Sequence, residues 1–276
     1  RFSRGLSEAG GAVDDDMQRV VRLLFRAQKH MYRVLGAKVP FMKISDLCRF
    51  GSGSNRGIHG DSTHLLRKLS ADKWTVSHVV EPFARAAAMR NPAIWRALGL
   101  DPESVPQLWG DPIAAYQRVG AFKTQSTDEA RTAFRRAWAS RIVYEDSDLI
   151  TYVPKDADCH RTVGTQPLLN VYIQLGTGDY LRDYVLRDRC GIDIRTAQLA
   201  VNGPLALLGS ACEGMPFATI DLASASDCVA TEVVKFLVPP AWFAFFSSIR
   251  TPSYVLPGDE SPRRYEKMCA MGNGFC

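Results

Sequence analysis

The stretch FATIDLASASD, residues 217–227, combines a structural pattern with a chemical one in this 276-residue chain. A short apolar run ends at Asp221, a turn of small residues follows, and a helix is expected from about Asp227 to the prolines Pro239 and Pro240. The pattern therefore predicts Asp221 at the end of a buried strand. Asp227 has two interpretations: its carboxylate caps the helix, or it points back into the same cleft as Asp221.

A carboxylate at such a strand end, with small residues beside it, leaves room for a divalent cation and a triphosphate. Phosphoryl transfer uses cations because negative charge builds up on the reacting oxygens. Two ions about 3.5–4 Å apart can stabilise the attacking and leaving oxygens together. One aspartate is insufficient for such a site, so the role of Asp227 matters.

The composition is that of a globular protein. The chain has 34 Lys and Arg against 29 Asp and Glu, a net charge of +5, with 46% hydrophobic and 23% charged residues. These values argue against a disordered, collagen-like or low-complexity protein. The longest apolar runs are far shorter than the roughly 20 residues that span a bilayer, so no membrane partner is expected.

Charge is distributed unevenly along the chain. Residues 19–136 contain 20 basic and 9 acidic residues, whereas residues 137–276 contain 12 basic and 16 acidic residues. A basic half joined to a mildly acidic half is typical of a protein that binds a polyanion with one part and metal ions with the other. A solvated basic surface is the alternative interpretation.

Hydrophobic spacing predicts a mostly helical first half. Residues 17–35 form an expected amphipathic helix with a basic outer face, and a second helix is expected from Thr127. The pattern changes near Ser140, where residues 141–145 and 149–153 are predicted to pair as a hairpin. A further helix is expected over residues 166–189.

Three blocks resemble motifs of one enzyme family, the RNA-dependent RNA polymerases (replicase beta subunits) of leviviruses. Residues 219–227 resemble its motif A. Residues 153–157, 161–162 and 166–170 resemble its basic motif F, and residues 271–275 (MGNGF) resemble its motif B. All three blocks occur in the family's order, which makes the resemblance more specific than a single pair of aspartates.

The resemblance implies an α+β right-hand polymerase with a mostly helical fingers region and a partial, RNA-recognition-like palm. Residues 1–139 would form a helical, basic N-terminal and fingers region, residues 140–216 the fingers with motif F, and residues 217–276 the partial palm from motif A to motif B. The family's palm continues to a Gly-Asp-Asp hairpin that these 276 residues lack. The chain alone is therefore expected to be catalytically incomplete.

The resemblance also assigns roles to four charged residues. Asp221 would be catalytic and bind Mg²⁺ or Mn²⁺, and Asp227 would be catalytic and select the ribonucleotide through its sugar hydroxyls. Lys155 and Arg161 would neutralise the incoming triphosphate, which agrees with the need for cations facing phosphates. Without the resemblance, Lys155 and Arg161 would be interpreted as part of a solvated loop.

Two residues of the MGNGF block receive roles in the same way. Asn273 would contact the nucleotide sugar or the template strand, and Gly272 would permit close approach of the backbone. An ordinary turn is the alternative interpretation for Gly272.

The function implied is that of a viral replicase, which joins NTPs to a growing RNA 3′ end on an RNA template by a two-metal mechanism. Its partners would be template and product RNA, NTPs and host translation factors, in the cytoplasm of an infected bacterium. The alternative is a non-catalytic RNA-binding or assembly protein that uses the basic first half. Metal-dependent NTP binding distinguishes the two, because both bind RNA.

Overall fold

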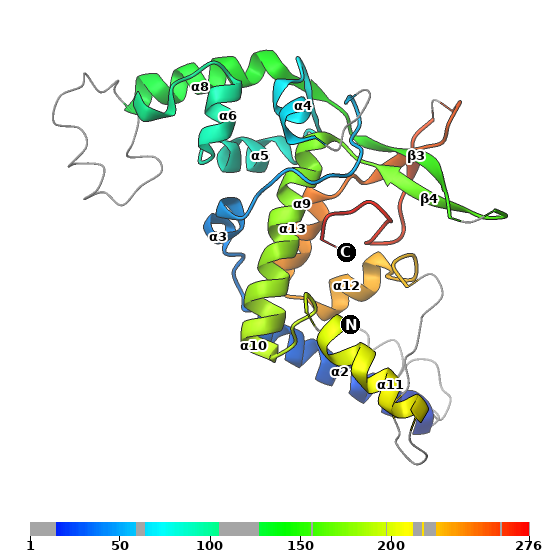
Figure 1. Cartoon of the computed structure of the whole chain (residues 1–276). Coiled ribbons are helices and arrows are strands. Elements are labelled where there is room, and N and C mark those ends of the chain that lie inside the picture. Colours follow the sequence, from blue (N-terminus) through cyan, green and yellow to red (C-terminus); the bar gives the residue numbers. More distant parts are fainter. Residues whose placement is uncertain are drawn as a thin grey trace, which may run out of the picture.

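Helices dominate the described part of the chain, and the strands described there form two small sheets (Figure 1). The computed structural model describes residues 15–58, 64–104, 127–155, 157–196, 198–211, 217, 225–259 and 261–275. No helix within these ranges is both long and apolar enough to cross a membrane. The mixture of helix and sheet agrees with the predicted α+β class, whereas the domain boundaries after residues 139 and 216 stay predictions.

The elements follow one another in this order. The α-helices are α2 (Asp15–Leu35), α3 (Phe41–Asp46), α4 (Leu65–Ser70), α5 (Glu81–Ala88), α6 (Pro92–Ala97), α8 (Thr127–Arg141), α9 (Leu168–Tyr180), α10 (Asp188–Cys190), α11 (Gly203–Ala211), α12 (Thr231–Leu237) and α13 (Pro240–Ile249). Shorter or wider helical segments are η1 (Pro102–Ser104), η3 (Leu181–Arg187) and η4 (Gln198–Asn202). The strands are β1 (Trp74–Val76), β2 (Ile142–Tyr144), β3 (Ser147–Pro154), β4 (His160–Thr165), β5 (Ser253–Val255) and β6 (Arg263–Arg264).

Helix α9 lies at the centre of the fold and is buried on nearly all sides. Eleven of its 13 residues are buried, and α3, α5, α13 and β1 contact it (Figure 1). Gly176 allows α3 to approach closely, since a Cβ there would lie 2.8 Å from the carbonyl oxygen of Ile44 and 2.7 Å from the Sγ of Cys48. The predicted helix over residues 166–189 is confirmed as α9, η3 and α10.

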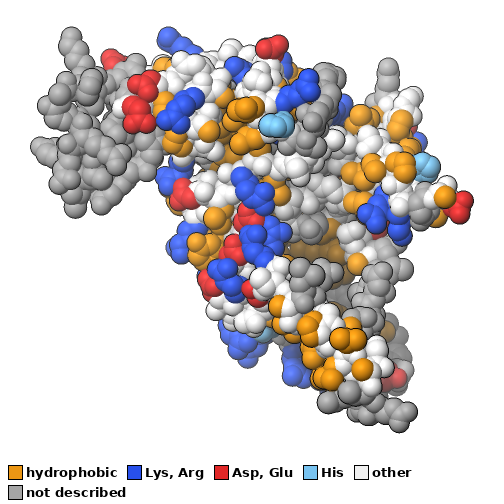
Figure 2. Space-filling view, in the orientation of Figure 1, with side chains coloured by type: hydrophobic (Ala, Val, Ile, Leu, Met, Phe, Trp, Pro, Cys, Tyr) orange, Lys and Arg blue, Asp and Glu red, His pale blue; other side chains and the backbone are white. Residues whose placement is uncertain are grey.

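The other predicted helices of the first half are also confirmed, as α2 and α8. Helix α2 packs against α12, where the rings of Phe25 and Phe236 meet edge to face with centroids 5.5 Å apart. Helix α11 is apolar in sequence but has no buried residue, and Leu207 is 70% exposed. Figure 2 shows hydrophobic side chains gathered on the surface around this helix.

The predicted hairpin between residues 141–145 and 149–153 is wrong. Strand β2 instead pairs in parallel with β1, and β3 pairs with β4 in a hairpin that closes where the N–H of Lys155 donates to the carbonyl of Cys159 at 2.9 Å. The expected turn residue Asp146 accepts a hydrogen bond from the backbone N–H of His78 at 2.8 Å. Both runs are strands, but tertiary partners decide which strands pair.

The larger sheet has the strand order β4-β3-β5-β6. Strand β3 is antiparallel to β4 and parallel to β5, which begins two residues after Thr251. This arrangement brings the first half of β3 beside the segment that follows α13. As a result, Asp148 is a buried strand residue and not the turn residue that the hairpin prediction made it.

The helix expected to begin near Asp227 begins at Thr231 instead, as α12. Residues just before it pair with a distant segment: the N–H of Met268 donates to the carbonyl of Val229 at 2.7 Å. This extended pairing competes with an earlier helix start. The strand predicted for residues 217–221 lies outside the described residues beyond Phe217.

Candidate active site

The predicted metal ligand, Asp221, lies outside the residues that the structure describes. Among the described residues, no group of three or more His, Cys, Asp and Glu side chains is placed to hold a metal ion. The metal role of Asp221 therefore stays a prediction. The other predicted site residues, Asp227, Lys155, Arg161, Gly272 and Asn273, are all described.

Asp227 is bound to a lysine and does not cap a helix. Its Oδ1 lies 2.5 Å from the Nζ of Lys267, with both side chains partly exposed. The N-cap position of α12 is occupied by Ala230, whose methyl side chain cannot accept a hydrogen bond, so the capping interpretation of Asp227 is wrong. The carboxylate of Asp227 thus lies beside the C-terminal segment of the chain.

Gly272 and Asn273 belong to a loop that runs along the free edge of β4. The N–H of Gly164 donates to the carbonyl of Met271 at 2.9 Å. Gly272 has a φ of +114°, and a Cβ on it would collide with the carbonyl oxygen of Gly164. Glycine is required here both for its backbone conformation and for this close approach.

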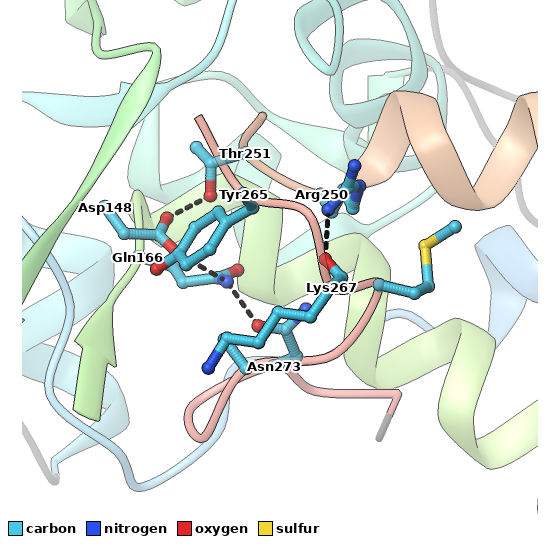
Figure 3. Close-up of a pocket in the computed structure, with 9 residues that line it drawn as sticks. Asp148, Gln166, Arg250, Thr251, Tyr265, Lys267 and Asn273 are labelled. Atoms are coloured by element: carbon cyan, nitrogen blue, oxygen red, sulfur yellow. Dashed lines mark hydrogen bonds between the residues drawn. The ribbon is translucent and has the colours of Figure 1, made fainter. Parts of the chain in front are cut away.

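A chain of side-chain amides connects this loop to β3 and α9 (Figure 3). The Nε2 of Gln166 donates to the Oδ1 of Asn273 at 2.6 Å and to the Oδ2 of Asp148 at 3.1 Å. The Nε2 of Gln174 donates to the Oε1 of Gln166 at 2.6 Å, and the Oε1 of Gln174 accepts the N–H of Gly274 at 2.9 Å. Three segments of the chain therefore meet at one hydrogen-bonded network.

Asp148 is the charged member of this network and is 0% exposed. Its carboxylate accepts hydrogen bonds from the hydroxyls of Thr251 and Tyr265, the latter at 3.1 Å, as well as from Gln166. Burial raises the pKa of Asp148 to about 6. The three hydrogen bonds and the nearby charge of Arg56 lower the pKa but do not cancel the effect of burial.

Asp148, Gln166 and Asn273 line one small pocket, together with a buried arginine. Arg250 donates from Nη1 to the carbonyl of Lys267 at 2.6 Å, while its buried Nε has no hydrogen-bond partner among the described residues. Burial lowers the pKa of Arg250. The full lining is Asp148, Gln166, Arg250, Thr251, Tyr265, Lys267, Met268, Ala270 and Asn273. Lys267 thus joins the pocket to Asp227.

Lys155 and Arg161 lie near the tip of the β3–β4 hairpin, and both are exposed. Arg161 is opposite Val153 in the ladder, and Lys155 follows Val153 by two residues, so both cations are on the same face. Alternation puts Asp148 and Gln166 on the other face. The structure thus brings the two predicted triphosphate ligands together on one face, apart from the buried network.

Comparison with known proteins assigns the chain to a family. The family model described as RNA replicase, beta-chain matches residues 13–276. The chain belongs to this family. The predicted membership of the replicase beta-subunit family is therefore confirmed, whereas the assignment of the three sequence blocks to motifs A, F and B stays a prediction.

Two relatives show how much of the replicase family the chain covers. It is 39% identical over 124 residues to the RNA-directed RNA polymerase subunit beta of Escherichia virus Qbeta. This aligned region is 45% of this chain and 20% of that protein. It is 25% identical over 255 residues to the RNA-directed RNA polymerase subunit beta of Enterobacteria phage SP. That alignment includes 92% of this chain and 35% of the phage SP protein. The chain thus spans about a fifth to a third of the length of these replicase subunits.

Sequence reasoning missed most of the pocket of this replicase chain. Asp148 falls between the two runs that the sequence predicts as a hairpin, and Tyr265, like Gln174 of the adjoining network, belongs to no recognisable motif. Gln166 was part of the block resembling motif F but was given no role. Only the blocks that resemble motif F and motif B pointed to part of this pocket, since they contain Gln166 and Asn273, which are hydrogen-bonded to each other.

Proposed function

We propose that this chain is part of a viral RNA-directed RNA polymerase with a right-hand fold. The polymerase transfers nucleotidyl groups from NTPs to the 3′ end of RNA on an RNA template. The observation that carries this proposal is the match of the replicase family to residues 13–276. The direct contact between Gln166 and Asn273, from the blocks resembling motif F and motif B, supports it.

The proposed roles follow the chemistry of the side chains. Lys155 and Arg161 neutralise the triphosphate as the pyrophosphate leaves. Asp227 and Asn273 bind the sugar hydroxyls. The ion pair with Lys267 suits Asp227 to a hydrogen-bonding role, because the lysine occupies one carboxylate oxygen and opposes a metal ion there.

Asp221 is the proposed ligand of Mg²⁺ or Mn²⁺, which supplies charge stabilisation to the attacking and leaving oxygens. The carboxylate is the ligand type that these hard cations prefer. Template and product RNA, NTPs and host translation factors are the proposed partners, in the cytoplasm of an infected bacterium.

A test uses the whole polymerase that contains this chain. Asp221→Ala should abolish Mg²⁺-dependent NMP incorporation on an RNA template while RNA affinity stays within about twofold of wild type, since one carboxylate contributes little to phosphate contacts. Asp128→Ala is the matched control, because Asp128 on α8 is 95% exposed in its side chain and belongs to none of the blocks that resemble the family's motifs. Retained incorporation in the Asp221 variant would overturn the assignment.

One observation favours the non-catalytic RNA-binding alternative. The basic side chains of α2, namely Arg19, Arg22, Arg26, Lys29 and Arg33, are all exposed. They form a row that fits a polyanion without any catalytic site. Calorimetric titration of the 276-residue chain with NTP, with and without Mg²⁺, and then with RNA separates the two functions. Metal-dependent NTP binding supports the polymerase. A chain that binds RNA but shows no metal-dependent NTP binding supports the alternative.

A further inference from the structure

The hydrogen bonds around Gln166 have only one possible direction. A carboxylate and a backbone carbonyl can only accept, so Asp148 and the carbonyl of Ile249 act as two fixed acceptors. Asp148 requires the Nε2 of Gln166 to face it, and the Ile249 carbonyl requires the Nε2 of Gln174 to face it, at 2.9 Å. Both anchors give the same orientation for Gln166, with Oε1 toward Gln174 and Nε2 toward Asn273.

This direction fixes the side-chain amide of Asn273. Because the Nε2 of Gln166 donates to it, Asn273 must turn its Oδ1 inward and its Nδ2 outward. No described residue accepts a hydrogen bond from this Nδ2, and Asn273 is only partly buried. The end of Asn273 that faces outward is therefore a pure hydrogen-bond donor.

The backbone on either side of Asn273 is held as well. Met271 accepts from the N–H of Gly164 on β4, and Gly274 donates to Gln174 on α9. The loop therefore has a fixed position, and the remaining freedom at Asn273 is a rotation of its amide. Figure 3 shows Gln166 between the side chains of Asp148 and Asn273, hydrogen-bonded to both.

We infer that Gln166, oriented by Asp148, is a positioning residue that holds the Nδ2 of Asn273 as a donor toward a hydroxyl oxygen of the nucleotide sugar. The inference rests on the proposed polymerase function and deepens it. A preset donor discriminates between a sugar that offers the hydroxyl acceptor and one that lacks it, because the unmatched donor loses its partner on binding. Gln166 and Asp148 thereby contribute to selection of ribonucleotides without touching them.

The first test concerns the network alone and needs no catalysis. In the 276-residue chain with ¹⁵N-labelled Asn and Gln, NMR should show slow exchange for the Nε2 protons of Gln166 and fast exchange for the Nδ2 protons of Asn273. Gln166→Glu replaces the donor by an acceptor, so the Asn273 amide should rotate and its Nδ2 protons should become protected. Unchanged exchange at Asn273 in this variant would overturn the inference whatever the chain's activity.

The second test measures sugar selection in the whole polymerase. Gln166→Glu should lower the ratio of kcat/KM for NTP to that for the matching 2′- or 3′-deoxy analogue by about tenfold, the effect of one hydrogen bond. Asp128→Ala is again the control, because this exposed residue of α8 is not part of the network and its replacement should leave the ratio unchanged. A merely structural role would lower both kcat/KM values equally, and an unchanged ratio would overturn the inference.

A second variant covers the case in which Gln166→Glu does not fold, as judged by circular dichroism. Asp148→Asn keeps the shape of the anchor but adds a donor, so Gln166 is no longer forced into one orientation. The ratio should fall by about threefold, less than for Gln166→Glu, because Gln174 still favours the native direction. A wild-type enzyme that incorporates no NMP would refute the proposed function. The NMR experiment would still test whether Gln166 orients the Asn273 amide.

Discussion

Gly178 of α9 lies directly against the carbonyl of Gly274, and a Cβ on Gly178 would be 2.6 Å from that oxygen. This contact holds the C-terminal loop against the central helix. Gly178→Ala should push the loop away and destabilise the chain by about 1–3 kcal/mol, the usual range for overpacking. Urea unfolding measures this change. Gly53→Ala is the control, because nothing lies within 4 Å of a Cβ at Gly53, and an equal loss there would contradict the role given to the contact.

The pair of Asp227 and Lys267 should matter more for nucleotide binding than for stability. The pair is partly exposed, so Lys267→Met should change the free energy of unfolding by less than about 1 kcal/mol. In the whole polymerase the freed carboxylate loses its fixed orientation, and KM for NTP should rise about threefold to tenfold. Steady-state kinetics give KM, and Lys235→Met on α12, whose pair with Glu232 is also exposed, is the matched control. Equal KM values in the two variants would count against a site role for Lys267.

Asp148 should make the chain less stable as pH rises from about 4 to 6. Its pKa is about 6 in the folded chain and 3.8 in the unfolded chain, so between these values the folded state binds more protons. The free energy of unfolding should therefore fall by up to about 3 kcal/mol over this window. Urea unfolding between pH 4 and 7 measures the slope. Asp148→Asn should flatten it, and an unchanged slope would show that other groups cause it.

Asp179 should act in the opposite direction and at lower pH. Burial alone would raise its pKa, but hydrogen bonds and charges from Arg49 and Arg182 lower it to about 2. Its contribution to stability is complete above about pH 4 and is lost as pH falls toward 2. Figure 2 shows acidic and basic side chains interleaved on the surface near α3 and the lower end of α9.

Replacing Asp179 tests this contribution directly. Asp179→Asn leaves Arg49, Arg182 and Arg195 facing one another without their shared counter-ion, and should destabilise the chain by about 2 kcal/mol. Thermal unfolding at pH 7 measures the loss. Asp188→Asn is the control, because Asp188 is half exposed and its ion pair is with Arg187, its neighbour in the chain. A loss of similar size at Asp188 would show that Asp179 and its three arginines contribute no more to stability than an exposed ion pair.

Local patterns predicted α2, α8 and α9 correctly, whereas α12 begins four residues later than expected. The apolar spacing in α2, α8 and α9 reflects contacts between residues three and four apart in the chain. A short stretch of sequence already contains both partners of each contact. The strands near residues 141–153 were also recognised as strands. Their pairing was not, because β2 joins β1 and β3 joins β4 and β5 through contacts that no local window records.

The family and the main helices could be predicted from the sequence alone, because motif order and helical periodicity are properties of the chain itself. The surroundings of Asn273 emerged only from the packed fold. Gln166 lies 107 positions before it in the chain, and Asp148 accepts from Tyr265 across 117 positions. Such contacts depend on how β3, β4 and α9 pack together. A buried polar side chain needs a hydrogen-bond partner, but the sequence around it does not indicate which distant residue that partner is.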